Sequence, residues 1–265
     1  MSDWKNKVVA ITGGSAGLGL VIARAFHARG ATVALVARDA TKLDKAASDL
    51  GSERVLTITA DVTDEHKAAD AMNQIVDQAG RLDVLVNNVG KSVRIDMMKT
   101  TLDDYRSFME INCLTAIGCT YAALDALEKT SGHVVNVGSL SSKTAWPYLA
   151  PYTTSKFALA AFNHHLRLEG PQNVHYMLVC PGPIKRDDAG VRYDEQTKDL
   201  PESARKPAAG AKLKGMEPAE LAELIIRGCE KRQLEILPFK ARIVLMANAL
   251  SPKLGDWYLK RKMKK

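Results

Sequence analysis

The stretch "KVVAITGGSAGLGLVIARAFHARG", residues 7–30, decides the fold because it joins a strand, a glycine-rich turn and a helix without a break. The apolar run 7–12 predicts a buried strand. Residues 18–30 predict a helix, for which Gly30 is a natural C-terminal cap. A strand that runs through a glycine turn into a helix is the opening unit of a nucleotide-binding α/β sheet.

Three glycines give this turn its predicted function. Gly13, Gly17 and Gly19 allow a tight turn, close approach of the backbone to a phosphate, and close packing of helix on sheet. The start of the helix offers free N–H groups and positive dipole to that phosphate. Leu20 and Val21 stand where a Walker A loop needs Lys and Ser or Thr, so we interpret the turn as a dinucleotide site. The residues expected to bind the dinucleotide here are Gly13, Ser15, Gly17, Leu18 and Gly19.

Strands and helices alternate along the rest of the chain. Apolar runs predict strands at 32–37, 55–60, 84–88, 133–138 and 174–182, and helical patterns lie at 39–50, 64–79, 102–129 and 152–169. Strands that are apolar throughout are buried on both faces, as in a parallel sheet covered by helices. The sequence therefore predicts one α/β domain over residues 1–265, a doubly wound parallel sheet (Rossmann fold) with helices on both faces.

The composition is that of an ordinary globular protein, with 46% hydrophobic and 25% charged residues. Its net charge of +7 is not accompanied by a recognisable nucleic-acid module, so we expect no nucleic-acid partner. The four cysteines show no metal-ligand spacing and are interpreted as reduced thiols, with no metal site. The first residues lead directly into a strand, which leaves no room for a signal peptide. We therefore expect a cytoplasmic protein.

The end of the second strand indicates which nicotinamide cofactor is preferred. An acidic residue there would bond both ribose hydroxyls and repel a 2′-phosphate, whereas this chain has Ala37 followed by Arg38. A guanidinium suits the 2′-phosphate of NADP, and Lys42 would add positive potential. Asp39 is interpreted as a helix cap in preference to a ribose ligand. We expect NADP(H) to be preferred over NAD(H).

The helix predicted at 152–169 carries a tyrosine and a lysine one turn apart. Tyr152 and Lys156 share a helix face, so the phenol and the ammonium are neighbours. Taken alone, the pair is better explained by a lysine that packs over an aromatic ring. The motifs elsewhere in the chain favour a catalytic pair instead.

The chain resembles the short-chain dehydrogenase/reductase family over nearly its whole length. The motifs that carry the resemblance are "TGGSAGLG" (12–19), "DV" (61–62), "NNVG" (87–90), Asn112, Ser139, "YTTSK" (152–156) and "PGPI" (181–184). The resemblance implies an NADP(H)-dependent oxidoreductase that interconverts a secondary alcohol and a ketone or aldehyde. A non-enzymatic NADP sensor is an alternative, although a sensor would not need an acid/base group.

The resemblance also implies a role for each catalytic residue. Tyr152 would be the general acid/base, with Lys156 favouring its phenolate and binding the nicotinamide ribose. Ser139 would donate to the substrate oxygen, and Asn112 would hold a water that links Lys156 to a proton relay. Without the resemblance, Ser139 would be interpreted as a turn or cap residue and Asn112 as a helix residue satisfied by backbone.

Further cofactor contacts are implied at the ends of other strands. Asp61 and Val62 would bracket the adenine, Asn88, Val89 and Gly90 would pass along the adenosine ribose, and Pro181, Gly182 and Ile184 would face the nicotinamide. Two positions depart from the family pattern. Val89 replaces the usual alanine, and Arg186 stands where a threonine commonly holds the carboxamide, which leaves that contact open.

The substrate side is predicted less sharply. The residues expected to line the pocket are Val93, Arg94, Trp146, Tyr148 and Leu149, unless they belong to the core. Their apolar character predicts a hydrophobic or lipid-like carbonyl substrate. Residues 185–216 interrupt the strand–helix rhythm and are interpreted as a substrate lid, with a surface loop as the alternative.

The C-terminal extension, residues 239–265, is apolar and basic. It resembles the tails of the branch with membrane-associated steroid, retinoid and sphingoid-base reductases. It could contact an anionic membrane, which would make the chain a lipid-surface binding module, or it could cover a partner subunit or pack with a solvated end. We also expect a homodimer or homotetramer that associates through the helices at 102–129 and 152–169.

Overall fold

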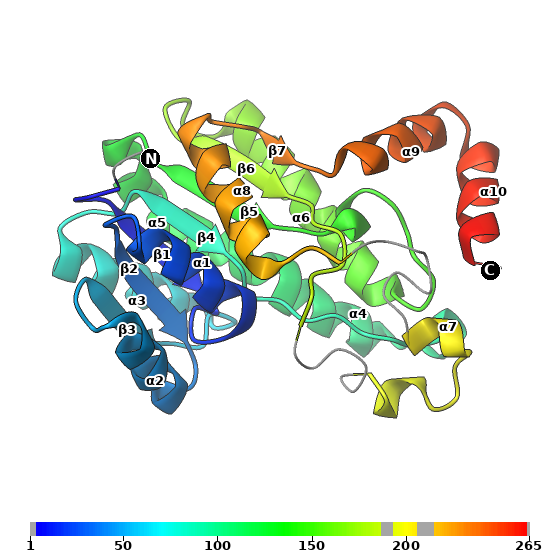
Figure 1. Ribbon diagram of the computed structural model, residues 1–265, viewed down its shortest axis with the longest axis horizontal. Coiled ribbons are helices and arrows are strands. Elements are labelled where there is room, and N and C mark those ends of the chain that lie inside the picture. Colours follow the sequence, from blue (N-terminus) through cyan, green and yellow to red (C-terminus); the bar gives the residue numbers. More distant parts are fainter. Residues whose placement is uncertain (1–3, 187–192, 206–214, 264–265) are drawn as a thin grey trace.

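Seven parallel strands form the centre of the molecule, and they occur in the order β3-β2-β1-β4-β5-β6-β7 (Figure 1). The computed structural model describes residues 4–186, 193–205 and 215–263. The strands are β1 (Val8–Thr12), β2 (Thr32–Ala37), β3 (Val55–Thr59), β4 (Val84–Asn87), β5 (His133–Val137), β6 (His175–Val179) and β7 (Glu235–Ile236). The first six confirm the predicted strands. The sequence analysis does not assign β7, because two residues are too few to show a pattern.

Helices cover both faces of the sheet, which confirms the doubly wound fold. Helices α1 (Gly17–His27), α2 (Ala40–Leu50) and α8 (Pro218–Glu230) pack on one face, and α3 (Glu65–Ala79), α5 (Thr115–Thr130) and α6 (Ala150–Glu169) pack on the other. Phe26 and Met72 are fully buried examples from the two faces. The sequence analysis does not assign α8. Helix α1 ends at His27, before the predicted end at Gly30, because Gly30 is used in the following turn with φ +95°.

The helix predicted at 102–129 is divided in the structure. Helix α4 (Leu102–Met109) continues into a π-helical turn, η2 (Glu110–Leu114), before α5 begins. A π turn adds a residue to the helical repeat and changes the direction in which its side chains point. The buried Asn112 lies in this turn. The chain is therefore helical throughout the predicted range, and the sequence analysis does not assign the π turn within it, where a functional side chain is expected.

The order of the strands positions the site. Strand β1 lies between β2 and β4, so the chain leaves β1 on one side and later returns on the other. Open α/β sheets bind ligands outside the carboxyl ends of their strands at such a switch point. The glycine turn after β1 and the "NNVG" segment after β4 meet there.

Two regions extend beyond this core. In the expected lid, the described part contains η4 (Glu195–Thr197) and α7 (Glu202–Arg205), while residues 187–192 and 206–214 lie outside the described residues. After β7, helices α9 (Phe239–Leu250) and α10 (Pro252–Met263) run away from the sheet (Figure 1). No described helix is long and apolar enough to cross a membrane.

Candidate active site

The glycine turn brings helix α1 unusually close to the end of β1. A Cβ added to Gly19 would lie 2.3 Å from the carbonyl oxygen of Gly13, and Gly13 and Gly17 themselves have φ values of +67° and +54°. Glycine alone satisfies these requirements without strain. Within the described turn and helix, Ala16 gives α1 no side-chain cap and its first turn has no acidic residue. The amides at this helix end therefore face a place that fits the diphosphate of a dinucleotide.

Thr12 and Asn88 tie together the two strand ends at the switch point. The side chain of Asn88 donates to the Thr12 carbonyl over 3.0 Å, and the hydroxyl of Thr12 accepts from the amides of Asn88 (3.0 Å) and Val89 (3.2 Å). The sequence analysis does not include Thr12 among the site residues. The sequence feature that could have identified Thr12 is its position as the polar last residue of an otherwise apolar strand. These bonds fix the turn against the "NNVG" segment.

Arg38 and Asp61 lie side by side at the ends of β2 and β3. Their charged groups are 3.6 Å apart, and 70% of the Arg38 side chain is exposed. Burial by itself would raise the pKa of Asp61. Hydrogen bonds from Thr63 and the charge of Arg38 outweigh that effect and hold this pKa below its usual value. Val62 is buried beside this pair. The structure thus brings the expected adenosine-side residues Arg38, Asp61 and Val62 together.

The neighbouring residues Asp39 and Lys42 are occupied with each other. Asp39 caps α2 by accepting from the Lys42 amide over 3.0 Å, which confirms its interpretation as a helix cap. The ammonium of Lys42 lies 2.9 Å from the Asp39 carboxylate. The extra positive potential expected from Lys42 is therefore largely compensated.

Tyr152 and Lys156 lie near the start of α6, and Lys156 contacts the end of β5. The Lys156 side chain is buried and its ammonium donates to the Val137 carbonyl over 2.8 Å. Burial lowers the pKa of Lys156 to about 8, because an interior disfavours the charged form. Tyr152 is half-buried as a residue, but its hydroxyl group is buried. Burial raises the pKa of Tyr152, and a hydrogen bond with Ser139 offsets only part of this rise. Tyr152 is therefore a neutral phenol, able to donate a proton.

Ser139 serves as a cap and as a neighbour of Tyr152. It precedes the short helix η3 (Leu140–Ser142), accepts from the Ser141 amide over 3.1 Å, and its own amide donates to the Ser142 hydroxyl. The alternative interpretation as a cap residue thus holds, together with the contact to Tyr152. The cap fixes the position of the hydroxyl that meets the phenol.

Asn112 is held by three hydrogen bonds. Its Oδ1 accepts from the Lys91 amide (2.8 Å), and its Nδ2 donates to the Lys91 carbonyl (3.1 Å) and to the Ser155 hydroxyl (3.0 Å). A Cβ at Gly90 would lie 2.7 Å from Asn112 Oδ1 and 3.5 Å from Lys156 Nζ. Gly90 thus leaves the space in which Asn112 and Lys156 approach each other.

Arg94 connects the segment after β4 to the expected lid. It is buried, its Nε donates to the Ala204 carbonyl over 3.0 Å, and its guanidinium lies 4.3 Å from the centre of the Tyr193 ring. The Tyr193 hydroxyl hydrogen-bonds Ser92. Tyr193 and Arg94 are also close enough to Tyr152 for their charges to act on its pKa, in opposite directions. The sequence analysis does not single out Tyr193.

A backbone hydrogen bond joins the two segments that carry the remaining residues expected at the substrate. The Ile95 amide donates to the Tyr148 carbonyl over 3.0 Å, which joins the Val93 segment to residues 146–149. Tyr148 has φ +63°, a conformation that is uncommon for a side chain of this size. Trp146 is half-buried and Leu149 is buried at the start of α6.

The segment that follows β6, residues 180–186, is held by backbone contacts at two points. The Pro181 carbonyl accepts from the Leu140 amide over 3.0 Å, next to the Ser139 cap. Ile184 pairs with Met216 in an isolated parallel bridge, with Gly182 between these fixed points. The residues expected on the nicotinamide side therefore lie between η3 and the start of α8.

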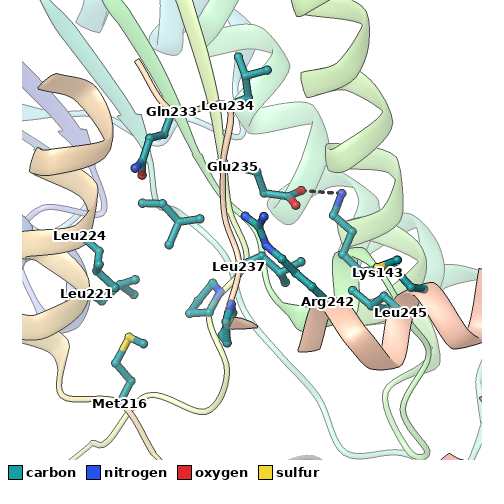
Figure 2. Close-up of a pocket in the computed structure, with 14 residues that line it drawn as sticks. Lys143, Met216, Leu221, Leu224, Gln233, Leu234, Glu235, Leu237, Arg242 and Leu245 are labelled. Carbon is teal, nitrogen blue, oxygen red and sulfur yellow. Dashed lines mark ion pairs between the residues drawn. The ribbon is translucent and has the colours of Figure 1, made fainter. Parts of the chain in front are cut away.

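A groove of about 980 Å³ lies elsewhere, at the β7 edge between α8 and α9 (Figure 2). Lys143 and Glu235 form an ion pair of 2.7 Å across it. Among its described lining residues, Pro181 is the one that the sequence analysis also expects at the cofactor. Ser139, Tyr152 and Lys156 do not line it, so it is not the catalytic site.

Comparisons with known proteins agree with this arrangement. The family described as "short chain dehydrogenase" matches residues 7–197. Dehydrogenase/reductase SDR family member 7B of Danio rerio is 30% identical over 86% of this chain and 76% of its own length. The 11-beta-hydroxysteroid dehydrogenase 1A of Arabidopsis thaliana is 31% identical over 95% of this chain and 74% of its own length. Meso-2,3-butanediol dehydrogenase of Serratia marcescens is 34% identical over 68% of this chain and 72% of its own length.

Solved structures show the same fold. A short-chain dehydrogenase from Streptomyces avermitilis superposes with a TM-score of 0.80 at 26% identity, covering 100% of both chains. An alcohol dehydrogenase from Thermococcus sibiricus complexed with 5-hydroxy-NADP gives a TM-score of 0.72 at 25% identity, covering 88% of this chain and 95% of the other. With the sheet order and the glycine turn, these matches show that the chain belongs to the short-chain dehydrogenase/reductase family, as an NAD(P)-dependent enzyme that interconverts alcohols and carbonyl compounds.

Proposed function

We propose that this enzyme uses NADP(H) to interconvert a secondary alcohol and a ketone or aldehyde of hydrophobic, lipid-like character. The observation that carries the proposal is the meeting of Ser139 with Tyr152, together with the approach of Lys156 and Asn112 to each other at Gly90 of the "NNVG" segment. An NADP sensor would not require a hydroxyl pair with a buried ammonium at this place. The complete set therefore favours catalysis over sensing.

The proposed proton transfer follows from the environment of each group. The bound nicotinamide supplies or accepts the hydride. In the reducing direction, the neutral phenol of Tyr152 gives its proton to the substrate oxygen, while Ser139 donates a hydrogen bond to that oxygen. The positive charge of Lys156 stabilises the phenolate that forms. Because burial lowers the pKa of Lys156 to about 8, this ammonium can also pass a proton on near neutral pH.

Replacing Tyr152 by Phe tests this chemistry. Tyr152→Phe keeps the ring but removes the proton donor, so turnover should fall about 10²–10⁴-fold, the size of a lost general acid. NADPH affinity should stay near that of the wild type. Alcohol oxidation by the wild type should rise with pH through one ionisation, because the phenolate is the base, and this rise should vanish in the variant. Stopped-flow absorbance and NADPH fluorescence titration provide the two measurements.

Two further variants sharpen that experiment. Lys156→Ala should lose both turnover and cofactor affinity, because Lys156 is assigned both the stabilisation of the Tyr152 phenolate and a bond to the nicotinamide ribose. Tyr105→Phe removes a phenol hydroxyl from α4 that is given no role in the proposed chemistry, and should leave turnover unchanged. Near-normal turnover in Tyr152→Phe would show that the proton comes from another group.

The preference for NADP(H) is proposed from Arg38. Its exposed guanidinium is held only loosely by Asp61, at 3.6 Å, so it is available to a 2′-phosphate beside the end of β2. A charge-assisted, bidentate contact of this kind favours the phosphorylated cofactor. The 5-hydroxy-NADP named with the Thermococcus sibiricus structure belongs to that protein but supports the same class of cofactor.

Arg38→Ala should weaken NADPH binding by roughly 1.5–3 kcal/mol and leave NADH binding nearly unchanged. Lys42→Ala is the matched control, because its ammonium is already paired with Asp39 and should contribute less. Isothermal titration of both cofactors into each protein measures the difference. Equal losses of NADPH and NADH affinity in Arg38→Ala would refute the assignment.

We propose that the described part of 185–216 is a substrate lid. Tyr193 lies on Arg94 and hydrogen-bonds Ser92, within electrostatic reach of the phenol of Tyr152. Its aromatic ring would close the mainly apolar pocket expected from Val93, Trp146, Tyr148 and Leu149. Such a pocket suits a hydrophobic carbonyl compound.

Tyr193→Ala should raise the KM for a hydrophobic ketone about tenfold, since it removes a hydrogen bond and a cation–π contact that hold the lid. NADPH affinity should not change. Lys198→Ala alters an exposed residue of the same segment, paired with Glu195, and serves as the control. Steady-state kinetics on a panel of ketones and aldehydes make the comparison, and an unchanged KM in Tyr193→Ala would contradict the lid.

The C-terminal extension is proposed to contact an anionic membrane surface. Residues 239–265 hold eight Lys or Arg and one Asp, so residues 1–238 hold 29 basic and 29 acidic residues and have no net charge. Phe239, Met246, Leu250 and Trp257 are exposed along α9 and α10. Exposed apolar side chains among excess positive charge are typical of helices that lie on anionic lipid.

Self-association is proposed through a different surface. Four apolar side chains of this helical region are exposed: Leu114 in the π turn, Tyr121 on α5, and Phe157 and Leu168 on α6. These helices are the ones expected to pair two copies about a two-fold axis. A homodimer or homotetramer formed in this way would leave α9 and α10 available for lipid.

One pair of samples tests both surfaces. The wild type should float with phosphatidylserine vesicles and not with phosphatidylcholine vesicles, and a Leu250→Glu, Trp257→Glu variant should lose this binding. Both proteins should show the same dimeric or larger mass by light scattering, because α5 and α6 are unchanged. Equal flotation of the two proteins would refute the membrane surface, and a monomeric wild type would refute the association.

A further inference from the structure

The segment that ends at Arg186 is fixed against the start of α8. The Lys185 amide donates to the Met216 carbonyl over 2.9 Å, and the Met216 amide donates to the Pro183 carbonyl over 2.8 Å. The side chain of Lys185 forms an ion pair with Glu217. The backbone that carries Arg186 is therefore held in place immediately before that residue.

Arg186 reaches back to the glycine turn. A Cβ built on Gly17 would lie 3.9 Å from Nη2 of Arg186, the one described atom within 4 Å of that point apart from the chain neighbours of Gly17 and the backbone of its own helix. The two residues are far apart in the sequence, so this approach is a product of the fold. The guanidinium and the first amides of α1 thus border the same place.

We propose that Arg186 binds the diphosphate of the cofactor from the side opposite the α1 N-terminus. This inference rests on the proposed use of a nicotinamide dinucleotide. The amides of α1 and its dipole attract an anion, and a guanidinium binds two phosphate oxygens at once through its planar fork. Arg186 would thus replace the carboxamide contact of the usual threonine with a phosphate contact, made by a residue at the base of the lid.

The role of Arg186 differs from that of Arg38. Arg38 lies at the end of β2 and is assigned to the 2′-phosphate, which NADH lacks. The diphosphate is common to NADPH and NADH. Loss of Arg186 should therefore weaken both cofactors by the same factor, whereas loss of Arg38 should discriminate between them.

Fluorescence titration measures these affinities without turnover. In Arg186→Ala the Kd for NADPH and for NADH should each rise by roughly tenfold or more, the size of a lost charge-assisted contact. Arg186→Lys should recover part of this loss, because it restores a charge but not a bidentate fork. Lys198→Ala removes an exposed cation of the same 185–216 segment, paired with Glu195, and is the control that should leave both Kd values unchanged. In competition experiments, Arg186→Ala should weaken ADP-ribose but not 2′-AMP, which has no diphosphate.

The outcomes separate the two proposals. Wild-type protein that binds neither NADPH nor NADH would overturn the proposed function together with this inference. If the wild type binds both cofactors, unchanged Kd values in Arg186→Ala would overturn the Arg186 assignment alone. A loss confined to NADPH, or an equal loss of 2′-AMP affinity, would also overturn it, because Arg186 would then act at another part of the cofactor. Circular dichroism of each variant establishes that it is folded.

Discussion

The close contact between helix α1 and the end of β1 is the constraint on which the rest of the site depends. At 2.3 Å from the Gly13 carbonyl, and 2.7 Å from the side chain of Asn88, no Cβ fits on Gly19. The helix therefore rests directly on the turn, and its free amides lie at the switch point of the sheet. Asn88 and Thr12 then lock the end of β4 to the same turn.

The proposed chemistry depends on a second constraint, the burial of Lys156. An ammonium is costly to bury unless it is bonded, and here its partner is the carbonyl of Val137 at the end of β5. Its lowered pKa, about 8, expresses that cost. The π turn beside it directs Asn112 at Ser155 on α6, so the helix that bears Lys156 is fastened to the neighbouring helix through polar contacts. Burial and bonding together fix the position of the Lys156 ammonium at the end of β5.

The distribution of charge separates the core from the extension. Residues 1–238 are balanced, and the whole net charge of +7 lies in residues 239–265. Positive charge therefore acts in two distinct ways in this protein. Near the ends of the strands, single guanidiniums lie at defined points, with Arg38 at Asp61 and Arg186 at Gly17, whereas along α9 and α10 positive charge accumulates among exposed apolar residues.

The sequence by itself determined the features that depend on neighbours in the chain. The apolar runs specify the strands, and the glycine pattern specifies the turn after β1. The caps at Asp39 and Gly80 also follow from local chemistry, because a carboxylate can bond the next turn of helix and glycine adopts a left-handed conformation. Those signals were sufficient for the fold class and for the order of the motifs.

Tertiary structure decided the features that depend on residues far apart in the sequence. Strand β7 exists because β6 offers it a partner, and the π turn in the predicted long helix shows no local signal. Which group a cation approaches also depends on the fold: Lys42 turns to Asp39, the cap of its own helix, whereas the guanidinium of Arg186 approaches Gly17. Periodicity and turn chemistry report only on contacts within a few residues of the chain. Arg186 and Asn112 acquire their surroundings only when the fold brings distant segments of the chain together.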